Sequence, residues 1–445
     1  MAYRSLLDRL GLHRRELRAW ALYDVANSAW MTTIIMIFPL FFYRVAASDL
    51  APEVARSRYA FAIAISTILV GLVGPVLGAI ADYRGTKKAF LGAFLAFGAA
   101  GTAAMYFIAD GQWVFALAMF IVSNIGIMTT LAFYNALLPG IASPDEIDRV
   151  STAGFALGYL GGGVLFLVNS LMIANPESFG IADAGTATRL AFASVAVWWV
   201  LFSIPLFRKV PEPPPRLEAD EEVGESPIVV AVRRLLETFR ELRTHKDAGL
   251  LLLSFLVYND AINTIIRLAT SYGSEVGIPE THMIAALVIV QFVGVPFAFA
   301  FGLLADRIGA KPAIFAALVV YSFISVYGFW LQTSAQFFVI AGLVGTVQGG
   351  AQALGRSLFA SVIPRHKAGE MFGFFGVFDR FGGALGSLVF GIMLATTGSS
   401  RPAILTLVVF FALGAFLLSK VDVERGRRVA REAEATVHVA ETGGA

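Results

Sequence analysis

The sequence predicts an all-α polytopic membrane protein, and three observations lead to this fold class. First, 57% of the 445 residues are hydrophobic and only 15% are charged, whereas a soluble globular chain carries about 25% charged residues. Second, apolar runs near the ~20 residues that a membrane-spanning helix requires recur along the whole chain. Third, basic residues gather in every second loop, as they do in helical membrane proteins.

The first half of the chain, residues 1–207, is predicted to contain six spans. The first begins with WALYDVANSAW, in which Asp24 and Asn27 are three residues apart and therefore share a helix face. The fifth contains the glycines of GYLGGG (158–163), which allow a close approach of a neighbouring helix. The six predicted ranges are 20–43, 58–82, 89–109, 113–138, 151–174 and 188–207.

Residues 208–248 form a polar linker. PEPPPR (211–216) is stiff and non-helical, whereas Ser226 and Pro227 resemble the N-cap and first position of a helix. The following residues, 228–243, place apolar side chains on one stripe. Two interpretations remain for this segment, an amphipathic helix on the cytoplasmic membrane surface or a solvated helix packed on neighbouring loops.

The second half, residues 249–420, is predicted to contain six further spans, followed by a polar cytoplasmic tail at 421–445. These spans are each long enough to cross a bilayer. Together with the first set they give twelve transmembrane helices in two six-helix halves. The ranges are 249–272, 281–305, 312–331, 335–363, 370–396 and 402–420.

The distribution of lysine and arginine predicts the orientation of these spans. The termini and every second loop hold most of the 34 basic residues. The alternate loops hold only Arg44, Arg56, Arg58, Arg189 and Arg401. Because basic loops stay in the cytoplasm, both termini are expected to be cytoplasmic, at the plasma (inner) membrane in a bacterium. A single miscounted helix would scramble the alternation, so it supports the count of twelve.

The two halves share local patterns, which indicates an internal repeat of the kind found in transporters. The loop GAIADYRGTKK (78–88) follows the second span, and GLLADRIGAKP (302–312) follows the eighth. In the first and seventh spans, YDVANS corresponds to YNDAINT (258–264), so that Asp24 matches Asp260.

The repeated loops resemble the conserved cytoplasmic motif of the major facilitator superfamily of secondary transporters. In that superfamily the aspartate of the motif faces the N-terminal end of a helix in the other half, where a carboxylate is favoured. Basic residues beside it help to close the cytoplasmic side. The resemblance implies the major facilitator fold and gating roles for Asp82, Arg84, Lys87, Asp306, Arg307 and Lys311.

A narrower resemblance covers most of the chain. WALYDVANSAW (20–30), FYNALLP (133–139), RVSTAGFALGYLGGG (149–163) and GGAQALGRSLFASVIP (349–364) are similar to the vacuole-effluxer-like branch of the superfamily. Fungal members of this branch are autophagy-related exporters of amino acids from the vacuole. The resemblance implies a small polar or zwitterionic substrate, with amino acids favoured.

Polar residues within the spans are the candidates for function, because a buried charge in a membrane is costly and usually faces a water-filled cavity or a partner. Stripes of such residues occur on predicted spans 1, 4, 7 and 10, and in the superfamily these helices surround the central cavity. The candidate substrate-binding residues are Tyr23, Asp24, Asn27, Asn124, Asn135, Asn263, Arg267, Gln352 and Arg356.

Proton coupling would require a carboxylate, because no histidine lies clearly in mid-span. The candidates are Asp24, Asp260 and Asp379, and Asp379 is also expected to form an internal pair with Arg380. A structural alternative stays open, in which Asp24 or Asp260 pairs with an arginine and braces the bundle.

These observations predict a secondary transporter that works by alternating access, with or without proton coupling. The alternatives are a lipid or lysolipid flippase on the same fold and a non-transporting sensor. An enzyme is not expected, because the sequence contains no P-loop, metal-ligand cluster or nucleophile motif, and the absence of cysteine excludes thiol chemistry. We expect a monomer in the lipid bilayer, with a small-molecule substrate but no cofactor, metal or nucleic-acid partner.

Overall fold

The computed structural model describes residues 6–217, 225–227, 229–231, 233–234, 246–397, 399–435 and 438–439. Within these ranges, six long helices precede the linker and six follow it, which confirms the all-α prediction. Eleven helices of the described chain are long and apolar enough to cross a membrane. The remaining long helix is α13 (Ala368–Thr397), which occupies the position of the eleventh predicted span.

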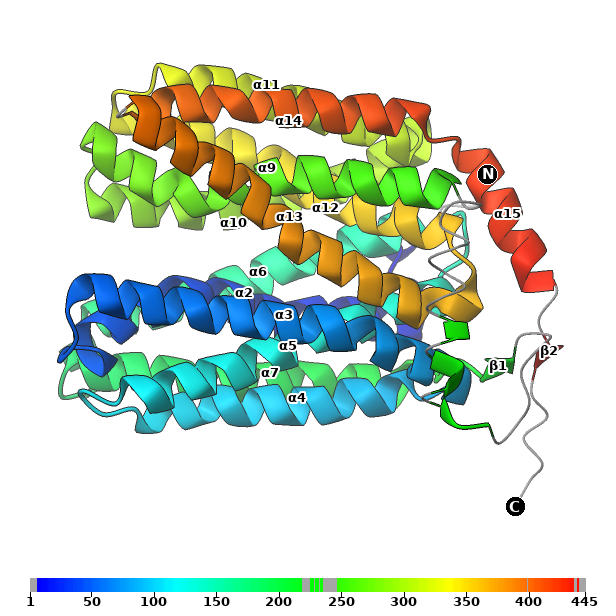
Figure 1. The fold of residues 1–445 in the computed structure, drawn as a ribbon, viewed down its shortest axis with the longest axis horizontal. Helices are drawn as coiled ribbons and strands as arrows, with labels where there is room; N and C mark the ends of the chain where they lie inside the picture. The colour runs from blue at the N-terminus through cyan, green and yellow to red at the C-terminus, as the bar shows by residue number, and fades with distance from the viewer. Residues whose placement is uncertain are drawn as a thin grey trace.

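The first six long helices form one lobe, the N lobe, and the next six form the C lobe (Figure 1). The N lobe contains α2 (Arg15–Phe41), α3 (Pro52–Arg84), α4 (Lys87–Ala104), α5 (Trp113–Ile141), α6 (Ile147–Ala174) and α7 (Ala184–Lys209). The C lobe contains α9 (Lys246–Val276), α10 (Glu280–Ile308), α11 (Ala310–Phe329), α12 (Ser334–Val362), α13 and α14 (Ser400–Lys420). Most of the helices extend beyond the predicted spans at one end or both, because their polar ends continue past the apolar runs, whereas α4 and α11 end short of them.

Local sequence signals fix several helix ends. Gly85 ends α3 with a φ of 62°, in the left-handed region that glycine tolerates best. Asp183 caps α7 by accepting a hydrogen bond from the Thr186 amide. Thr333 and Gln336 form a capping box at the start of α12. These signals set the lengths of the helices that carry the site.

The two lobes contact each other most extensively through two helix pairs, in which α6 packs on α10 and α3 packs on α13, and α5 and α12 add further contacts. Both contacts depend on glycine. A Cβ atom at Gly78 of α3 would lie 2.3 Å from the carbonyl oxygen of Gly369 on α13. A Cβ atom at Gly302 of α10 would lie 2.2 Å from the Thr152 hydroxyl on α6. Small residues therefore let the backbones of the two lobes approach closely.

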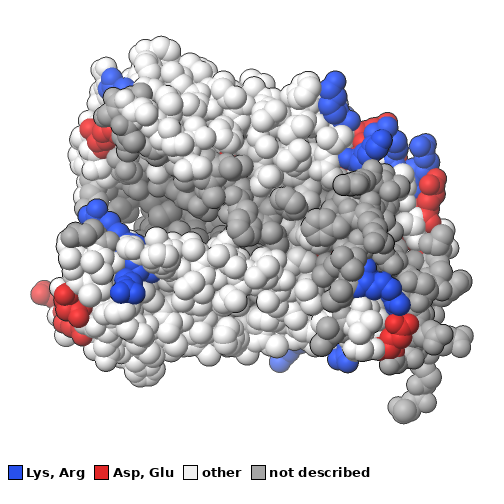
Figure 2. Space-filling model, viewed as in Figure 1, with Lys and Arg blue, Asp and Glu red and all other residues white. Residues whose placement is uncertain are grey.

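The molecule has two different ends, which we call the terminal end and the open end. The terminal end carries α1 (Leu6–Arg9), α15 (Val423–Ala435) and the strands β1 (Arg216–Leu217) and β2 (His438–Val439), which pair antiparallel (Figure 1). At the open end, the surface is hollowed between the lobes (Figure 2). The same view shows charged residues gathered at both ends and a broad uncharged band between them, as a membrane-embedded surface requires.

The linker is described only in part. Most of the predicted amphipathic segment, including residues 228, 232 and 235–243, lies outside the described residues. The prolines 213–215 pack beside Gly85, where an added Cβ would lie 2.7 Å from the Pro215 nitrogen. The described part of the linker therefore lies against the loop between α3 and α4.

Candidate functional site

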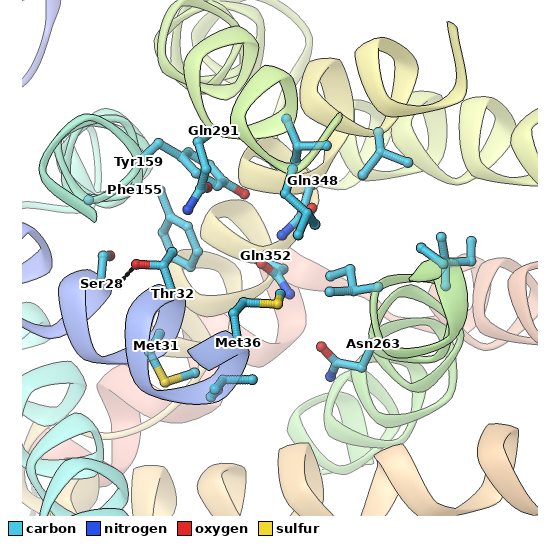
Figure 3. Close-up of a pocket in the computed structure, with 18 of the residues that line it drawn as sticks. Ser28, Met31, Thr32, Met36, Phe155, Tyr159, Asn263, Gln291, Gln348 and Gln352 are labelled. Atoms are coloured by element: carbon cyan, nitrogen blue, oxygen red, sulfur yellow. Dashed lines mark hydrogen bonds between the residues drawn. The ribbon is translucent and has the colours of Figure 1, made fainter. Parts of the chain in front are cut away.

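A cavity of about 410 Å³ lies between the two lobes (Figure 3). Its walls come from α2, α5 and α6 of the N lobe and from α9, α10 and α12 of the C lobe, with Phe375 of α13. Four of these helices are the predicted spans 1, 4, 7 and 10. Because both lobes contribute, the shape of the cavity depends on how the lobes are placed.

The cavity changes in character from its floor to its mouth. Its floor lies toward the terminal end, where Asp24 and Arg356 line it, and its mouth lies toward the open end, where Met36, Met283 and Phe337 line it. The floor is charged, whereas the mouth is largely apolar. A ligand that fits this cavity therefore has a polar end and a less polar end.

The floor contains an ion pair between the lobes. Nη2 of Arg356 on α12 lies 3.3 Å from Oδ2 of Asp24 on α2, and the two residues are 4% and 6% exposed. The Tyr134 hydroxyl donates to Oδ2 of Asp24 at 2.9 Å, and the Asn27 amide donates to Oδ1 at 3.0 Å. A buried ion pair is tolerated when hydrogen bonds also satisfy its charges, as they do here.

Arg356 directs its other donors to the N lobe as well. Nε donates to the Ser151 hydroxyl at 2.9 Å, and Nη2 donates to the Ser151 carbonyl at 2.9 Å. Nη1 donates to the Asn135 side chain at 3.3 Å. One C-lobe guanidinium therefore connects α2, α5 and α6 beneath the cavity.

Three aromatic rings of the N lobe surround the same guanidinium. Its central carbon lies 4.8 Å from the ring centre of Trp20, 5.5 Å from that of Tyr134 and 4.6 Å from that of Phe155. These distances fall within the range of cation–π attraction, which strengthens where water is excluded. Electrostatic attraction and ring contacts thus act on Arg356 together.

The walls above the floor carry neutral carboxamides. Gln352 donates to the Asn259 side chain at 3.2 Å, and Figure 3 shows Gln291, Gln348 and Gln352 near one another on the C-lobe side of the cavity. Each carboxamide donates and accepts hydrogen bonds, so this wall suits polar groups of either kind. The lining carboxamides are Asn27, Asn135, Asn259, Asn263, Gln291, Gln348 and Gln352.

Two predicted substrate contacts lie elsewhere. Tyr23 is fully buried inside the N lobe, where it contacts Trp199 and Tyr134. Asn124 donates to the Ser66 hydroxyl of α3 at 2.7 Å. Asn124 and Asn135 share a face of α5, but a helix that crosses its neighbours at an angle meets different partners along its length. Tyr23 and Asn124 therefore do not line the cavity, whereas Asn135 does.

Asp260, a candidate for proton coupling, does not line the cavity either. Its side chain is buried and accepts a hydrogen bond from the Gly386 amide of α13 at 2.6 Å, whereas Asn263 lines the cavity. Residues three apart on a helix differ by about 60° in direction, so one faces α13 and the other the cavity. The side chains of Arg267, Asp379 and Arg380 lie outside the described part of the structure.

The spacing of polar residues does not identify the aromatic residues around Arg356, or Ser151, as part of the site. Trp20, Tyr134 and Phe155 occur in apolar helices, where an aromatic ring is ordinarily core. Ser151 occupies the first turns of α6 among other small residues. No periodic pattern separates these residues from structural ones, so only the three-dimensional arrangement reveals them.

At the terminal end, Asp82 lies where the resemblance implied. Its carboxylate accepts hydrogen bonds from the amides of Gly369 at 3.0 Å and Glu370 at 2.9 Å, in the first turn of α13. Lys87 lies 2.7 Å from the same carboxylate. An N-lobe carboxylate thus caps a C-lobe helix and carries a buried lysine beside it.

The second repeated loop makes different contacts. Asp306 is partly exposed and lies 3.4 Å from Nε of Arg149 on α6. Lys311 donates to the carbonyls of Ser419 and Val421 at the end of α14, as Lys88 does at the end of α7. Arg84 and Arg307 are exposed. The two loops are similar in sequence but unequal in structure.

Among the carboxyl groups outside the spans with shifted pKa values, Glu146 and Glu212 connect separate segments of the chain. Burial opposes ionisation of Glu146, but the Ser143 amide and Arg14 outweigh it and lower the pKa. Burial raises the pKa of Glu212, although its carboxyl group accepts a hydrogen bond from the Lys88 amide at 2.9 Å, which acts in the opposite direction. Glu146 thereby anchors the start of α2, whereas Glu212 anchors the linker on α4.

Comparisons with known proteins agree with this fold. A family model described as "Vacuole effluxer Atg22 like" matches residues 12–431. An uncharacterized MFS-type transporter of Bacillus subtilis, YxiO, is 35% identical over 421 residues, which cover 93% of this chain and 96% of that protein. Autophagy-related protein 22 of Yarrowia lipolytica is 28% identical over 316 residues. That match covers 64% of this chain but 52% of the fungal protein, so it spans about half of that relative.

Among solved structures, the human organic anion transporter MFSD10 (TETRAN) matches with a TM-score of 0.69. The match covers 91% of this chain and 99% of the human chain at 15% identity. At this identity the likeness shows the fold alone.

Proposed function

The chain belongs to the Atg22-like vacuole effluxer family of major facilitator superfamily transporters, and from this premise we propose that it carries amino acids across a membrane by alternating access. It is an integral, multi-pass membrane protein and not an enzyme. The observation that carries the proposal is the cavity between the lobes, with its oppositely charged floor of Asp24 and Arg356.

The lining of the cavity supports a small zwitterion. Its floor offers a carboxylate and a guanidinium, which match an ammonium and a carboxylate group respectively. Its walls offer carboxamides, and its mouth offers Met36 and Met283 to an apolar side chain. A volume of about 410 Å³ falls within the range of small-molecule sites.

The contacts between the lobes support alternating access. The lobes are joined at the terminal end by the Arg356 bonds, by Asp82 on α13 and by the approach of Thr152 to Gly302. We propose that these contacts break when the transporter opens at the terminal end, and that this end faces the cytoplasm of a bacterial plasma membrane, because most basic residues flank it.

Proton coupling would act through Asp24. Protonation of this carboxylate would remove the charge that Arg356 faces at 3.3 Å, and the lobes would separate more readily. Asp24 is the candidate carboxylate that both lines the cavity and contacts the opposite lobe within the described structure.

A lipid or lysolipid flippase is the second candidate, because the mouth of the cavity is apolar. Ile35, Leu287 and Ile340 line it together with the methionines, and such a wall suits an acyl chain. The charged floor would then bind a polar headgroup.

Proteoliposomes test the proposal. The purified protein is reconstituted and assayed for uptake of a panel of labelled amino acids, with and without an imposed pH gradient. We expect uptake of at least one neutral amino acid, reduced at least about tenfold by Asp24→Asn, since the loss of a hydrogen-bonded charge costs more than 1.4 kcal/mol. Asp183→Asn, on an exposed helix cap, is the matched control and keeps full activity.

Two outcomes would contradict this proposal. Uptake that is unchanged in Asp24→Asn would remove the carboxylate from the mechanism. Movement of a fluorescent lysolipid between leaflets, without uptake of any amino acid, would favour the flippase.

A further inference from the structure

We propose that Asp24, Trp20, Tyr134 and Phe155 form a binding site for a cationic group, the cation cage, which Arg356 occupies only while the terminal end is closed. The inference rests on the proposed transport function and deepens it. It assigns to the N lobe the recognition of a protonated amine or guanidinium on the substrate, and it makes Arg356 an internal stand-in for that group.

The geometry of the cage is that of a cation receptor. Three rings lie 4.6–5.5 Å from the guanidinium carbon, and the Asp24 carboxylate lies 3.3 Å from Nη2. Aromatic faces together with a carboxylate form a recurring receptor for organic cations. Because Trp20 and Tyr134 are fully buried, water does not weaken these attractions.

The cage is held together by bonds that do not involve Arg356. Trp20 Nε1 donates to the Tyr134 carbonyl at 3.0 Å, and the two rings stack at 4.3 Å. The Tyr134 hydroxyl donates to Asp24, which also accepts from Asn27. All these residues belong to the N lobe, so the cage moves as one unit when the lobes change position.

Gly154 completes the cage from α6. A Cβ atom at this position would lie 2.4 Å from Oδ2 of Asp24, 3.2 Å from the Trp20 ring and 3.3 Å from Nη2 of Arg356. The absence of a side chain therefore leaves the space that the cation fills.

Arg356 belongs to the other lobe, and this difference gives the cage its role. When the lobes part at the terminal end, α12 withdraws and takes the guanidinium with it. Asp24 is then left as a charge among aromatic rings, which is strongly unfavourable without a partner. A substrate cation that enters from the terminal end restores the partner. The empty protein therefore resists opening at this end, and a cationic substrate favours it.

Chemical replacement of the arginine side chain tests the cage directly. Arg356→Ala leaves the cage vacant, and methylguanidinium chloride is the probe. We expect it to raise the thermal unfolding temperature of this variant by roughly 2 °C at millimolar concentration, as ligand binding to the folded state requires. The wild type, whose cage is filled, should show no such shift. Methylurea has the same planar shape without the charge and should shift neither protein.

Further variants separate the cage from general salt effects. Arg356→Gln also empties the cage but retains a polar side chain toward Ser151, and it replaces Arg356→Ala if that variant does not fold. Adding Trp20→Leu to either variant should abolish the shift. Arg428→Ala removes an exposed arginine of α15 and should behave as the wild type. A folded Arg356 variant that responds equally to methylguanidinium and methylurea, or to neither, overturns the proposal.

The cage and the proposed transport function can fail separately. If the vacant cage binds the cation but the wild type takes up no amino acid, the cage is supported and the proposed substrate class is contradicted. If the wild type takes up amino acids but the Arg356 variants do not bind the cation, the transport function is supported and the cage is contradicted.

Discussion

At the scale of single residues, the floor of the cavity depends on how Arg356 distributes its donors. A guanidinium has five N–H donors in a rigid fork, and here they reach one carboxylate, one hydroxyl, one amide oxygen and one backbone carbonyl. Lysine offers a point charge and cannot hold three helices in this way. Arg356 therefore acts on the position of the C lobe as well as on the charge of the site.

The contacts of Glu146 predict that the stability of the folded protein depends on pH. Its carboxylate pairs with Arg14, accepts the Ser143 amide at 2.9 Å, and lies 3.4 Å from His13. The pKa of Glu146 is lowered below its ordinary value of 4.5. A lowered carboxyl pKa stabilises the folded protein above the unfolded pKa, and this contribution is lost as the pH falls through the folded value.

We therefore expect Glu146→Gln to be less stable than the wild type at about pH 7, by roughly 1 kcal/mol because Arg14 is partly exposed. The difference should shrink to nothing in acid, well below the ordinary pKa of glutamate. Thermal unfolding in detergent at a series of pH values measures it. An equal difference at every pH would show that the charge of Glu146 has no part in the effect.

At the scale of helices, the repeated loops predict unequal gates. Asp82 caps the first turn of α13 with two backbone hydrogen bonds, whereas Asp306 is partly exposed and lies 3.4 Å from Nε of Arg149. A carboxylate at a partly buried helix N-terminus contributes up to about 2 kcal/mol. The closed terminal end therefore depends more on Asp82.

A cysteine reporter measures this difference, because the chain contains no cysteine of its own. Ser357→Cys places a thiol at a buried contact between α12 and Asp148 of α6. In this background, Asp82→Asn should increase labelling by a water-soluble maleimide about tenfold, the factor that 1.4 kcal/mol represents. Asp306→Asn, the matched change in the other loop, should increase it less than about twofold. Equal effects would show that the two loops share the gate.

The helices themselves were predictable from sequence because their apolar runs and alternating basic loops are strong, local signals. A polar residue within an apolar span is an equally local signal, and several residues predicted from it line the cavity: Asn27, Asn135, Asn263, Gln352, Asp24 and Arg356. The direction of Asp260 was not predictable, since the packing of α13 on α9 decides it. The partners of Arg356 were equally hidden, because they lie on three helices that come together only in the fold.

At the scale of the whole molecule, the structure shows one arrangement of the two lobes. The lobes touch through α6 and α10 and through α3 and α13, and the cavity floor is closed toward the terminal end. If alternating access is the mechanism, the contact between α6 and α10 must open at this end during each cycle. A covalent bond across it would stop transport without destroying the cavity.

Thr152 and Gly302 offer the place for this bond. A Cβ atom at Gly302 would lie 3.3 Å from Cβ of Thr152, close to the roughly 3.5–4.5 Å of a disulfide. The variant Thr152→Cys with Gly302→Cys should therefore crosslink under mild oxidation and lose nearly all uptake in proteoliposomes, and a reductant should restore it. Each single cysteine variant, treated with the same oxidant, controls for damage by oxidation and for the substitution itself. Because the crosslink holds the terminal end closed, the oxidised protein should still bind substrate from the open end, as measured by equilibrium binding in detergent. Full uptake by the crosslinked protein would mean that substrate crosses without separation of α6 from α10, and the rocking of the two lobes would have to be abandoned.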